Sequence, residues 1–167
     1  MNRKVNNRKP KSKTTEPMEA ALKYLEYRPR SIREVERHLD DCHYGEVEVM
    51  ETVQRLEELN LLNDFAYAED FVTTRLQTRP VSKAHLKEQM LSHELRPEAI
   101  EAALEKLSDG DEAQNALSVA EKYDRQLSAL PDDERRDKLI KRLLARGYGY
   151  ELVKTTLAQL GESAEQE

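Results

Sequence analysis

The most reactive side chains of the sequence lie at the end of one predicted helix. Asp40, Asp41, Cys42 and His43 are consecutive, and His38 precedes Cys42 by one helical turn. A histidine and a cysteine four residues apart can share a metal ion, but a closed zinc site needs four ligands. The chain has no second cysteine and no further Cys/His pair at ligand spacing. We therefore expect no metal here and interpret the cluster as a helix end whose polar groups satisfy backbone carbonyls.

Motifs for catalysis are missing from the rest of the sequence. It contains no G-x-x-x-x-G-K-[ST], G-x-G-x-x-G or G-x-S-x-G motif, and four of its five glycines fall at predicted turns or in the tail. With 33 acidic residues, a pair of neighbouring carboxylates carries no information. We predict a protein that is not an enzyme, needs no cofactor and no small-molecule substrate, and acts by binding a partner.

Arginines cluster around two proline turns and along a strongly basic segment at 135–146. If equivalent turns lie on one edge of the molecule, they form a basic stripe that suits phosphate or an acidic protein groove. The alternative is that these cations cover the backs of helices and pair with Glu one turn away. The candidate partner-binding residues are Arg28, Arg30, Arg75, Arg79, Arg135, Arg142 and Arg146.

The two ends of the chain differ in charge from its body. We predict a basic, disordered arm over 1–16 and an acidic tail over 161–167. Without the charges of 1–13 and of the last seven residues, the body holds 21 basic and 30 acidic residues, a net charge of −9. The arm is either a contact for nucleic acid phosphates or a solubilising leader. Its candidate nucleic-acid contacts are Arg3, Lys4, Arg8, Lys9, Lys11 and Lys13.

A threefold internal repeat organises the body. Its anchors Leu39, Met90 and Leu143 are 51 and 53 residues apart. The positions four before and five, ten, fourteen and seventeen after each anchor are apolar in all three copies. These intervals are typical of two helices separated by a turn.

Turn residues follow the same register. The segments 28–31 and 79–82 both read Arg-Pro-x-Ser, in which proline breaks one helix and serine caps the next. Ser31 and Glu34 match the S-x-x-E capping box, and 131–132, Pro-Asp, has the equivalent role in the third copy. Pro97 suits the first turn of its helix. Candidate N-caps of first helices are Asn63 or Asp64, and Asp109 or Asp111.

The sequence therefore predicts an all-α fold of three tandem three-helix repeats, over 17–62, 63–108 and 109–160. No segment alternates with period two as a strand would. The expected helices are 17–27, 31–41 and 46–59; then 64–78, 82–92 and 97–107; then 111–129, 133–145 and 149–160.

Composition limits the setting in which the protein acts. No stretch approaches the roughly 18 apolar residues of a membrane span, and no apolar segment of a secretory signal follows the basic N-terminus. The single cysteine, Cys42, forms no internal disulfide. We expect a reduced, cytoplasmic protein that is a monomer, because no apolar surface stripe is left over.

The sequence resembles the RecX family of bacterial regulatory proteins over about residues 18–160. Three blocks in order carry the resemblance: Ala21-Leu22-x-Tyr24-Leu25 with Arg28-Pro29-Arg30-Ser31, Glu34 and Leu39; Leu62-Asn63-Asp64-x-x-Tyr67-Ala68-x-x-Phe71-Val72-x-x-Arg75; and Leu143-Leu144-Ala145-Arg146-Gly147-Tyr148-Gly149-Tyr150 with Val153.

The resemblance implies three right-handed three-helix repeats stacked into an elongated, curved array. It also implies a regulator of DNA repair, homologous recombination and the SOS response that binds the RecA filament on DNA. Family members repress the ATPase, strand-exchange and coprotease activities of RecA, and can also bind DNA directly. The alternative is a helical DNA-binding regulator that acts on nucleic acid itself, which the arm and the basic segment favour and the acidic body disfavours. A helical scaffold without a link to nucleic acid is a third reading.

The sequence departs from the family pattern at the end of two middle helices. The family places glycine before the aromatic residue there, as in Gly147-Tyr148. The first copy has His43 and the second has Glu94 at the equivalent position. If both keep a left-handed backbone, each costs roughly 1 kcal/mol relative to glycine.

Overall fold

The computed structural model describes residues 16–164, with side chains as far as Gly161. The six basic residues predicted to contact nucleic acid, and Glu165 and Glu167 of the predicted tail, lie outside the described residues. Within this range the chain forms nine helices and no strand. They are α1 (Pro17–Leu25), α2 (Ile32–Asp41), α3 (Glu46–Glu58), α4 (Asp64–Thr78), α5 (Lys83–Ser92), α6 (Pro97–Glu105), α7 (Asp109–Gln126), α8 (Asp132–Leu144) and α9 (Tyr150–Ala164).

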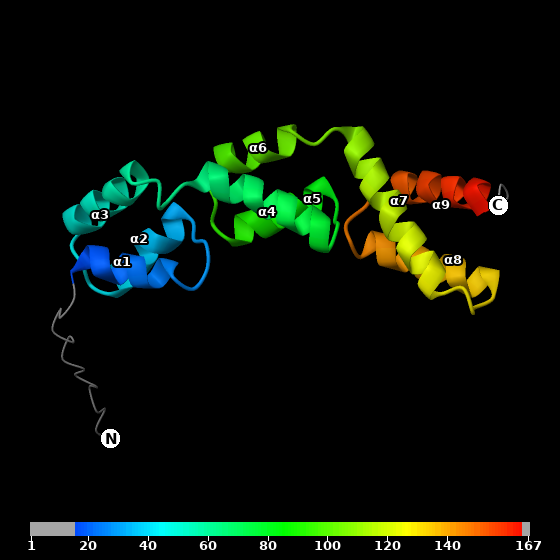
Figure 1. Cartoon of the computed structure of the whole chain (residues 1–167), viewed down its shortest axis with the longest axis horizontal. Helices are drawn as coiled ribbons and strands as arrows, with labels where there is room; N and C mark the ends of the chain where they lie inside the picture. Colours follow the sequence, from blue (N-terminus) through cyan, green and yellow to red (C-terminus); the bar gives the residue numbers. More distant parts are fainter. Residues whose placement is uncertain (1–15, 165–167) are drawn as a thin grey trace, which may run out of the picture.

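The helices form three groups of three that follow one another in chain order (Figure 1). Repeat 1 contains α1–α3, repeat 2 contains α4–α6 and repeat 3 contains α7–α9, and together they make an elongated, gently curved row. The all-α prediction and the three tandem three-helix repeats are therefore confirmed. None of the helices in the described range is long and apolar enough to cross a membrane.

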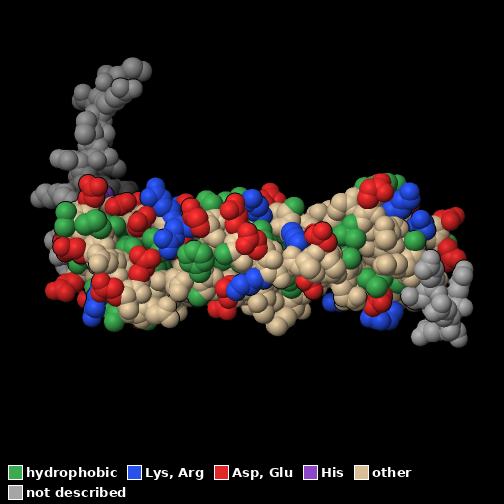
Figure 2. Space-filling model, turned by 90° about the horizontal axis from the view of Figure 1, so that it is seen from above, with side chains coloured by type: hydrophobic (Ala, Val, Ile, Leu, Met, Phe, Trp, Pro, Cys, Tyr) green, Lys and Arg blue, Asp and Glu red, His purple; other side chains and the backbone are tan. Residues whose placement is uncertain are grey.

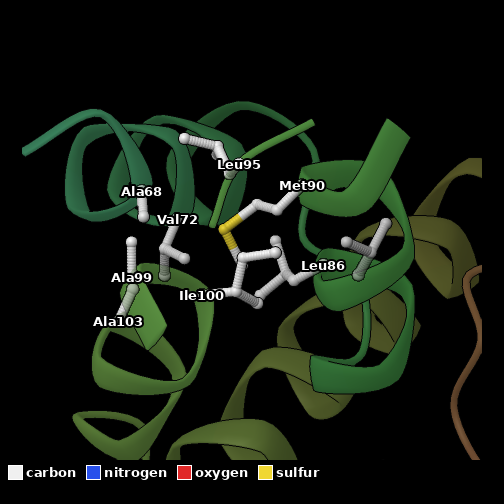
Figure 3. Packing of buried hydrophobic residues seen from close by; sticks show 9 residues of the cluster. Ala68, Val72, Leu86, Met90, Leu95, Ala99, Ile100 and Ala103 are labelled. Carbon is white, nitrogen blue, oxygen red and sulfur yellow. The ribbon is translucent and has the colours of Figure 1, made fainter. Parts of the chain in front are cut away.

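Each repeat has its own hydrophobic core. In repeat 2, Leu86 and Met90 of α5 pack against Ile100 of α6 and Val72 of α4 (Figure 3). The anchors Leu39, Met90 and Leu143 are all fully buried, which confirms the register of the internal repeat. The buried residues of the other two cores lie within 21–62 and 116–157. No core is shared between repeats, so other contacts must join them.

Helix caps agree with the sequence at most positions. Ser31 and Glu34 form the predicted capping box of α2, and Asn63 caps α4 through a 3.1 Å bond from the Ala66 N–H. The prediction of Asp109 or Asp111 as the cap of α7 is wrong, because Ser108 takes that position in a second capping box. A serine hydroxyl with an acidic residue three positions later satisfies two free N–H groups together.

Two other boundaries differ from expectation. Pro131 itself is the N-cap residue of α8 and makes no side-chain cap bond, while Asp132 pairs with Arg135 at 2.7 Å. At the far end, α9 continues past residue 160 to Ala164, into the segment predicted as an acidic tail. Neither Gly161 nor the acidic composition stops the helix.

The turn after each middle helix is left-handed, although only the third has glycine there. The φ angles are 65° at His43, 57° at Glu94 and 84° at Gly147. At the third turn the backbone itself lies close to the neighbouring repeat: a Cβ added to Gly147 would lie 2.5 Å from Ser82 Oγ. Glycine is required there for space as well as for backbone conformation.

Candidate partner-binding surface

A buried carboxylate joins repeats 1 and 2. Asp64, the first residue of α4, is fully buried. Its Oδ1 accepts the N–H of Ile32, the first residue of α2, at 2.9 Å, and its Oδ2 accepts the N–H of Arg96 at 3.2 Å. Arg96 Nε also lies 3.4 Å from Oδ2. One side chain at the start of α4 thus serves the amino-terminal ends of two other helices, α2 and α6, where free N–H groups and the helix dipole favour negative charge.

The junction between repeats 2 and 3 uses the same device. The N–H of Lys83, the first residue of α5, donates to Glu112 Oε1 in α7 at 2.9 Å. Lys83 Nζ lies 3.3 Å from Asp109 Oδ1. In both junctions, an acidic side chain from the first turn of the following repeat receives the first N–H of the preceding middle helix. This regularity fixes how consecutive repeats sit on one another.

The predicted candidates Arg28 and Arg30 lie beside the first junction, around Glu34. Arg28 Nη2 and Nη1 donate to the Glu34 carboxylate at 2.5 and 3.3 Å, and Arg30 Nη1 does so at 3.4 Å. The Arg30 guanidinium also stacks 4.0 Å from the centre of the Tyr24 ring. Burial alone would raise the pKa of Glu34, but hydrogen bonds from Arg28 and from the Ser31 N–H hold it below the ordinary value.

Arg75 lies on the other side of the same junction, in a shallow hollow. Pro29 of repeat 1 and Tyr67, Phe71 and Arg75 of α4 line this space of about 260 Å³. Arg75 Nε is buried without a hydrogen-bond partner among the described residues. Burial raises the pKa of Tyr67, and the cation of Arg28 opposes this. The structure therefore gathers Arg28, Arg30 and Arg75 around the boundary of repeats 1 and 2.

Arg142 and Arg146 gather on Tyr123 of α7, next to the second junction. Arg146 donates to Tyr123 Oη and to the Pro80 carbonyl oxygen, both at 2.7 Å. Its own carbonyl oxygen accepts the Ser82 N–H at 3.0 Å. The Arg142 guanidinium lies 4.2 Å from the centre of the Tyr123 ring. The hydrogen bond from Arg146 is the main cause that lowers the pKa of the Tyr123 phenol.

These contacts give Arg142 and Arg146 different surroundings. Arg146 is half-buried and spans the junction, whereas Arg142 is exposed and contacts only Tyr123 of the same repeat among the contacts described above. Arg79, at the C-terminal end of α4, is exposed and directly precedes Pro80. Arg79 and Arg142 are thus the candidates that are most accessible near the second junction.

Arg135 lies apart from both groups, within a set of acidic neighbours. It pairs with Asp124 of α7 at 3.2 Å and with Asp132 at 2.7 Å. The first turn of α8 is acidic, and its basic residues follow from Arg135 onward. Acidic residues at the start and basic residues at the end both favour a helix through its dipole. Of these cations, Lys138 and Lys141 are exposed and make no ion pair within the described residues.

The seven arginines do not form one continuous stripe. They lie in one group at each junction, with Arg135 beyond the second. Figure 2 shows acidic and basic side chains interspersed along one face of the row, without an unbroken basic band. The surface thus offers separated cationic points along the length of the molecule.

The Cys/His cluster at the end of α2 is a helix end. Cys42 Sγ lies 3.9 Å from His38 Nε2, and the His38 ring stacks on Tyr24 with centroids 4.0 Å apart. Burial is the main cause that lowers the pKa of His38. Across residues 16–164, no group of three or more His, Cys, Asp or Glu side chains could hold a metal ion.

Sequence reasoning missed the residues that hold the junctions. It gives Asp64 only as a possible cap, and it does not single out Arg96, Glu112 or Tyr123. The one signal that points to them is positional: an acidic residue falls in the first turn of the first helix in both later repeats. Which distant N–H group each carboxylate accepts depends on how the repeats stack.

The architecture defines the class of protein: a helical-repeat protein built from a row of three small three-helix units. Family models place it further. The model described as the first three-helix domain of RecX matches residues 18–56, and that described as the third three-helix domain matches residues 110–157. The chain belongs to the RecX family of regulatory proteins, which are not enzymes.

Relatives of known identity agree. The chain is 29% identical over 147 residues to the regulatory protein RecX of Halalkalibacterium halodurans, covering 88% of this chain and 55% of that protein. It is 28% identical to the regulatory protein RecX of Clostridium botulinum, covering 84% and 66%. The chain thus spans about half to two thirds of the length of these relatives. A shorter relative, from Prosthecochloris aestuarii, is 29% identical, with 89% and 96% covered.

Solved structures show the same fold. The crystal structure of RecX from Lactobacillus salivarius superposes with a TM-score of 0.73 at 28% identity, covering 87% of this chain and 94% of that one. A second crystal structure of a regulatory protein RecX superposes with a TM-score of 0.67 at 21% identity, which supports the fold alone.

Proposed function

We propose that this chain regulates the RecA recombinase. It binds the RecA filament on DNA and inhibits the ATPase, strand-exchange and coprotease activities of RecA. The observation that carries the proposal is membership of the RecX family, matched in both the first and the third three-helix domain. Regulation by binding also suits a chain whose candidate residues are cations rather than nucleophiles.

The shape of the molecule supports a filament as the partner. A filament presents the same surface at regular intervals. In a row of three similar repeats, each repeat can contact a different protomer. Contacts that are weak singly then add through the rigid connection between them. The arginine groups at the two junctions lie at separate points along the row, so each could contact a different protomer.

The ATPase activity of RecA on single-stranded DNA tests the proposal. We expect inhibition when the chain is titrated at well below one molecule per RecA, and we expect excess free DNA not to relieve it. Arg79→Glu with Arg142→Glu should weaken inhibition several-fold, because both side chains are exposed and lie near the second junction. Lys87→Glu with Lys154→Glu is the control, with an equal change of charge at exposed positions. No inhibition by the unmodified chain at an equal ratio would contradict the proposal.

A second candidate is direct action on DNA. Lys138 and Lys141 of α8, which are exposed and form no ion pair with any described residue, favour it, and the net charge of −6 opposes it. Fluorescence anisotropy on labelled DNA without RecA separates the two. A DNA reader binds with an affinity that falls steeply between about 50 and 200 mM salt. If Lys138→Glu with Lys141→Glu abolishes DNA binding but RecA inhibition persists, direct DNA binding is not the mechanism.

A further inference from the structure

Repeat 1 carries a groove that no contact of the described chain fills. It lies between α2 and α3, has a volume of about 600 Å³, and is floored by apolar side chains. These side chains are Ile32, Val49, Met50 and Val53. Met50 is 61% exposed over this floor, whereas Ile32, Val49 and Val53 are buried. A large exposed apolar side chain in an open groove indicates a surface that another segment can cover.

The rim of the groove is predominantly acidic. Its charged residues are Glu36, Asp40, Glu46 and Glu57 against Arg33 and Arg96. Both arginines are already engaged, Arg33 with Glu36 at 3.3 Å and Arg96 with Glu57 at 3.4 Å. Asp40 and Glu46 make no ion pair within the described residues. The charge that remains available on the rim is therefore negative, and the groove suits a basic segment with some apolar character.

The chain itself contains such a segment close by. Residues 1–15 hold six basic and no acidic residues, together with Met1 and Val5, and they lead directly into α1 of the same repeat. Repeat 1 is also the most acidic of the three, with eleven acidic and six basic residues over 17–62. Repeats 2 and 3 have net charges of only −2 and −1 over 63–108 and 109–160. Charge complementarity is greatest between the arm and the repeat that bears it.

The length of the arm is sufficient. Fifteen extended residues span up to about 50 Å, while a unit of this size has a radius of gyration of about 9 Å. A tether this short keeps the arm at an effective concentration on the order of millimolar at the groove. A contact that would be weak between separate molecules is therefore well occupied within one chain.

We propose that residues 1–15 dock in the groove between α2 and α3 of repeat 1, and that this contact withholds the basic arm from other anions. The apolar floor receives the side chain of Val5, and the rim carboxylates of Asp40 and Glu46 receive the basic side chains. To bind the arm, an anionic partner such as a DNA strand must compete with the groove and draw the arm out of it. The docking itself does not depend on RecA regulation, but its inhibitory consequence rests on the arm binding phosphate.

Paramagnetic broadening in the full chain tests the docking. A nitroxide is attached to Ser12→Cys in a Cys42→Ser background, and amide signals are recorded at low salt. We expect strong broadening at Val49 and Met50 and little on α6. Asp40→Asn with Glu46→Gln should reduce it several-fold. Glu98→Gln with Glu101→Gln, an equal charge change on exposed α6 positions, should not.

Two outcomes would overturn the proposal. One is an absence of broadening at Val49 and Met50, or broadening there that is unchanged in the Asp40/Glu46 variant. The other is equal broadening when a labelled chain without ¹⁵N is mixed with an unlabelled ¹⁵N chain, which would mean that the arm binds a second copy. For the inhibitory consequence, we expect the Asp40/Glu46 variant to bind single-stranded oligothymidine three- to tenfold more tightly than the Glu98/Glu101 variant. Equal affinities would overturn that consequence.

Discussion

Glu34 shows how a buried charge is tolerated in a small core. Its side chain is 6% exposed, and it accepts hydrogen bonds from Arg28, Arg30 and the Ser31 N–H. Burial alone would favour the neutral acid, but these donors stabilise the carboxylate, and the pKa lies below the ordinary value of 4.5. The unfolded chain therefore binds the proton more readily than the folded one. The ionised group stabilises the fold at neutral pH, and this contribution is lost as the pH falls through the folded pKa.

Glu34→Gln tests this role. We expect the free energy of unfolding at pH 7 to fall by about 1–3 kcal/mol, the usual contribution of hydrogen bonds to a charged group. The variant should also lose part of the acid sensitivity, so that the difference from the original chain shrinks below pH 4.5. Urea unfolding between pH 3 and pH 7 measures both effects. Glu36→Gln is the control, and an equal loss in it would show that Glu34 has no special role.

At Gly147, a close contact with Ser82 explains why the family places glycine before the aromatic residue. The φ of 84° at this glycine and the 2.5 Å approach that an added Cβ would make to Ser82 Oγ both exclude a larger residue. Gly147→Ala should therefore destabilise the chain by at least about 1 kcal/mol. The control is His43→Ala, in the equivalent left-handed turn of repeat 1, where the residue is exposed and not glycine. Thermal unfolding of the two variants checks this, and similar melting temperatures would remove the steric explanation.

Helices were predictable because their signals are local. Apolar spacing placed all nine, and proline and serine placed several of their starts, as at Ser31 and Pro97. The cap of α7 was predicted wrongly because Ser108, Asp109 and Asp111 can all cap a helix. In the structure, the Ser108 hydroxyl accepts the Asp111 N–H, and the Asp111 carboxylate accepts the Ser108 N–H. The predicted end of α9 is too early because acidic composition does not stop a helix: Glu and Ala are good helix formers.

Neighbouring leucines of α8 allow a matched test of the predicted register. Leu143 is fully buried and Leu144 is 42% exposed. Leu143→Ala should cost about 2–5 kcal/mol, through the lost transfer free energy and the cavity it leaves. Leu144→Ala should cost well under half as much, since the side chain is already partly in water. Chemical denaturation of both variants measures the two losses of unfolding free energy. A larger loss in Leu144→Ala than in Leu143→Ala would mean that α8 buries its other face.

The whole molecule is held together by polar contacts between separate cores. Asp64, Glu112 and Arg146 form these contacts, and none was recognised from sequence as a junction residue. The reason is that each pairs with a backbone group at least 29 residues away. For the same reason, sequence could not separate Arg146, which is built into the junction, from Arg142, which is exposed. A partner-binding test should therefore avoid Arg146, because its loss also changes the fold.

Asp64→Ala should uncouple repeat 1 from repeat 2. It leaves the buried N–H of Ile32 without an acceptor, at about 1–3 kcal/mol, and the part-buried N–H of Arg96 at a smaller cost. We expect hydrogen exchange to accelerate at the starts of α2 and α6 and to stay unchanged in repeat 3. Denaturant unfolding should also broaden, because the first repeat then unfolds separately. Faster exchange spread evenly over all three repeats would show that the row unfolds as one unit.

Separate cores also decide how the molecule responds to force and to ions. Bending the row disturbs no hydrophobic core, so its stiffness resides in the junctions, including exposed ion pairs such as Arg37 with Glu94 and Arg96 with Glu57. Salt weakens exposed pairs but leaves apolar packing intact. Raising the ionic strength should therefore make the row of repeats easier to bend at its junctions, while each repeat keeps its own stability.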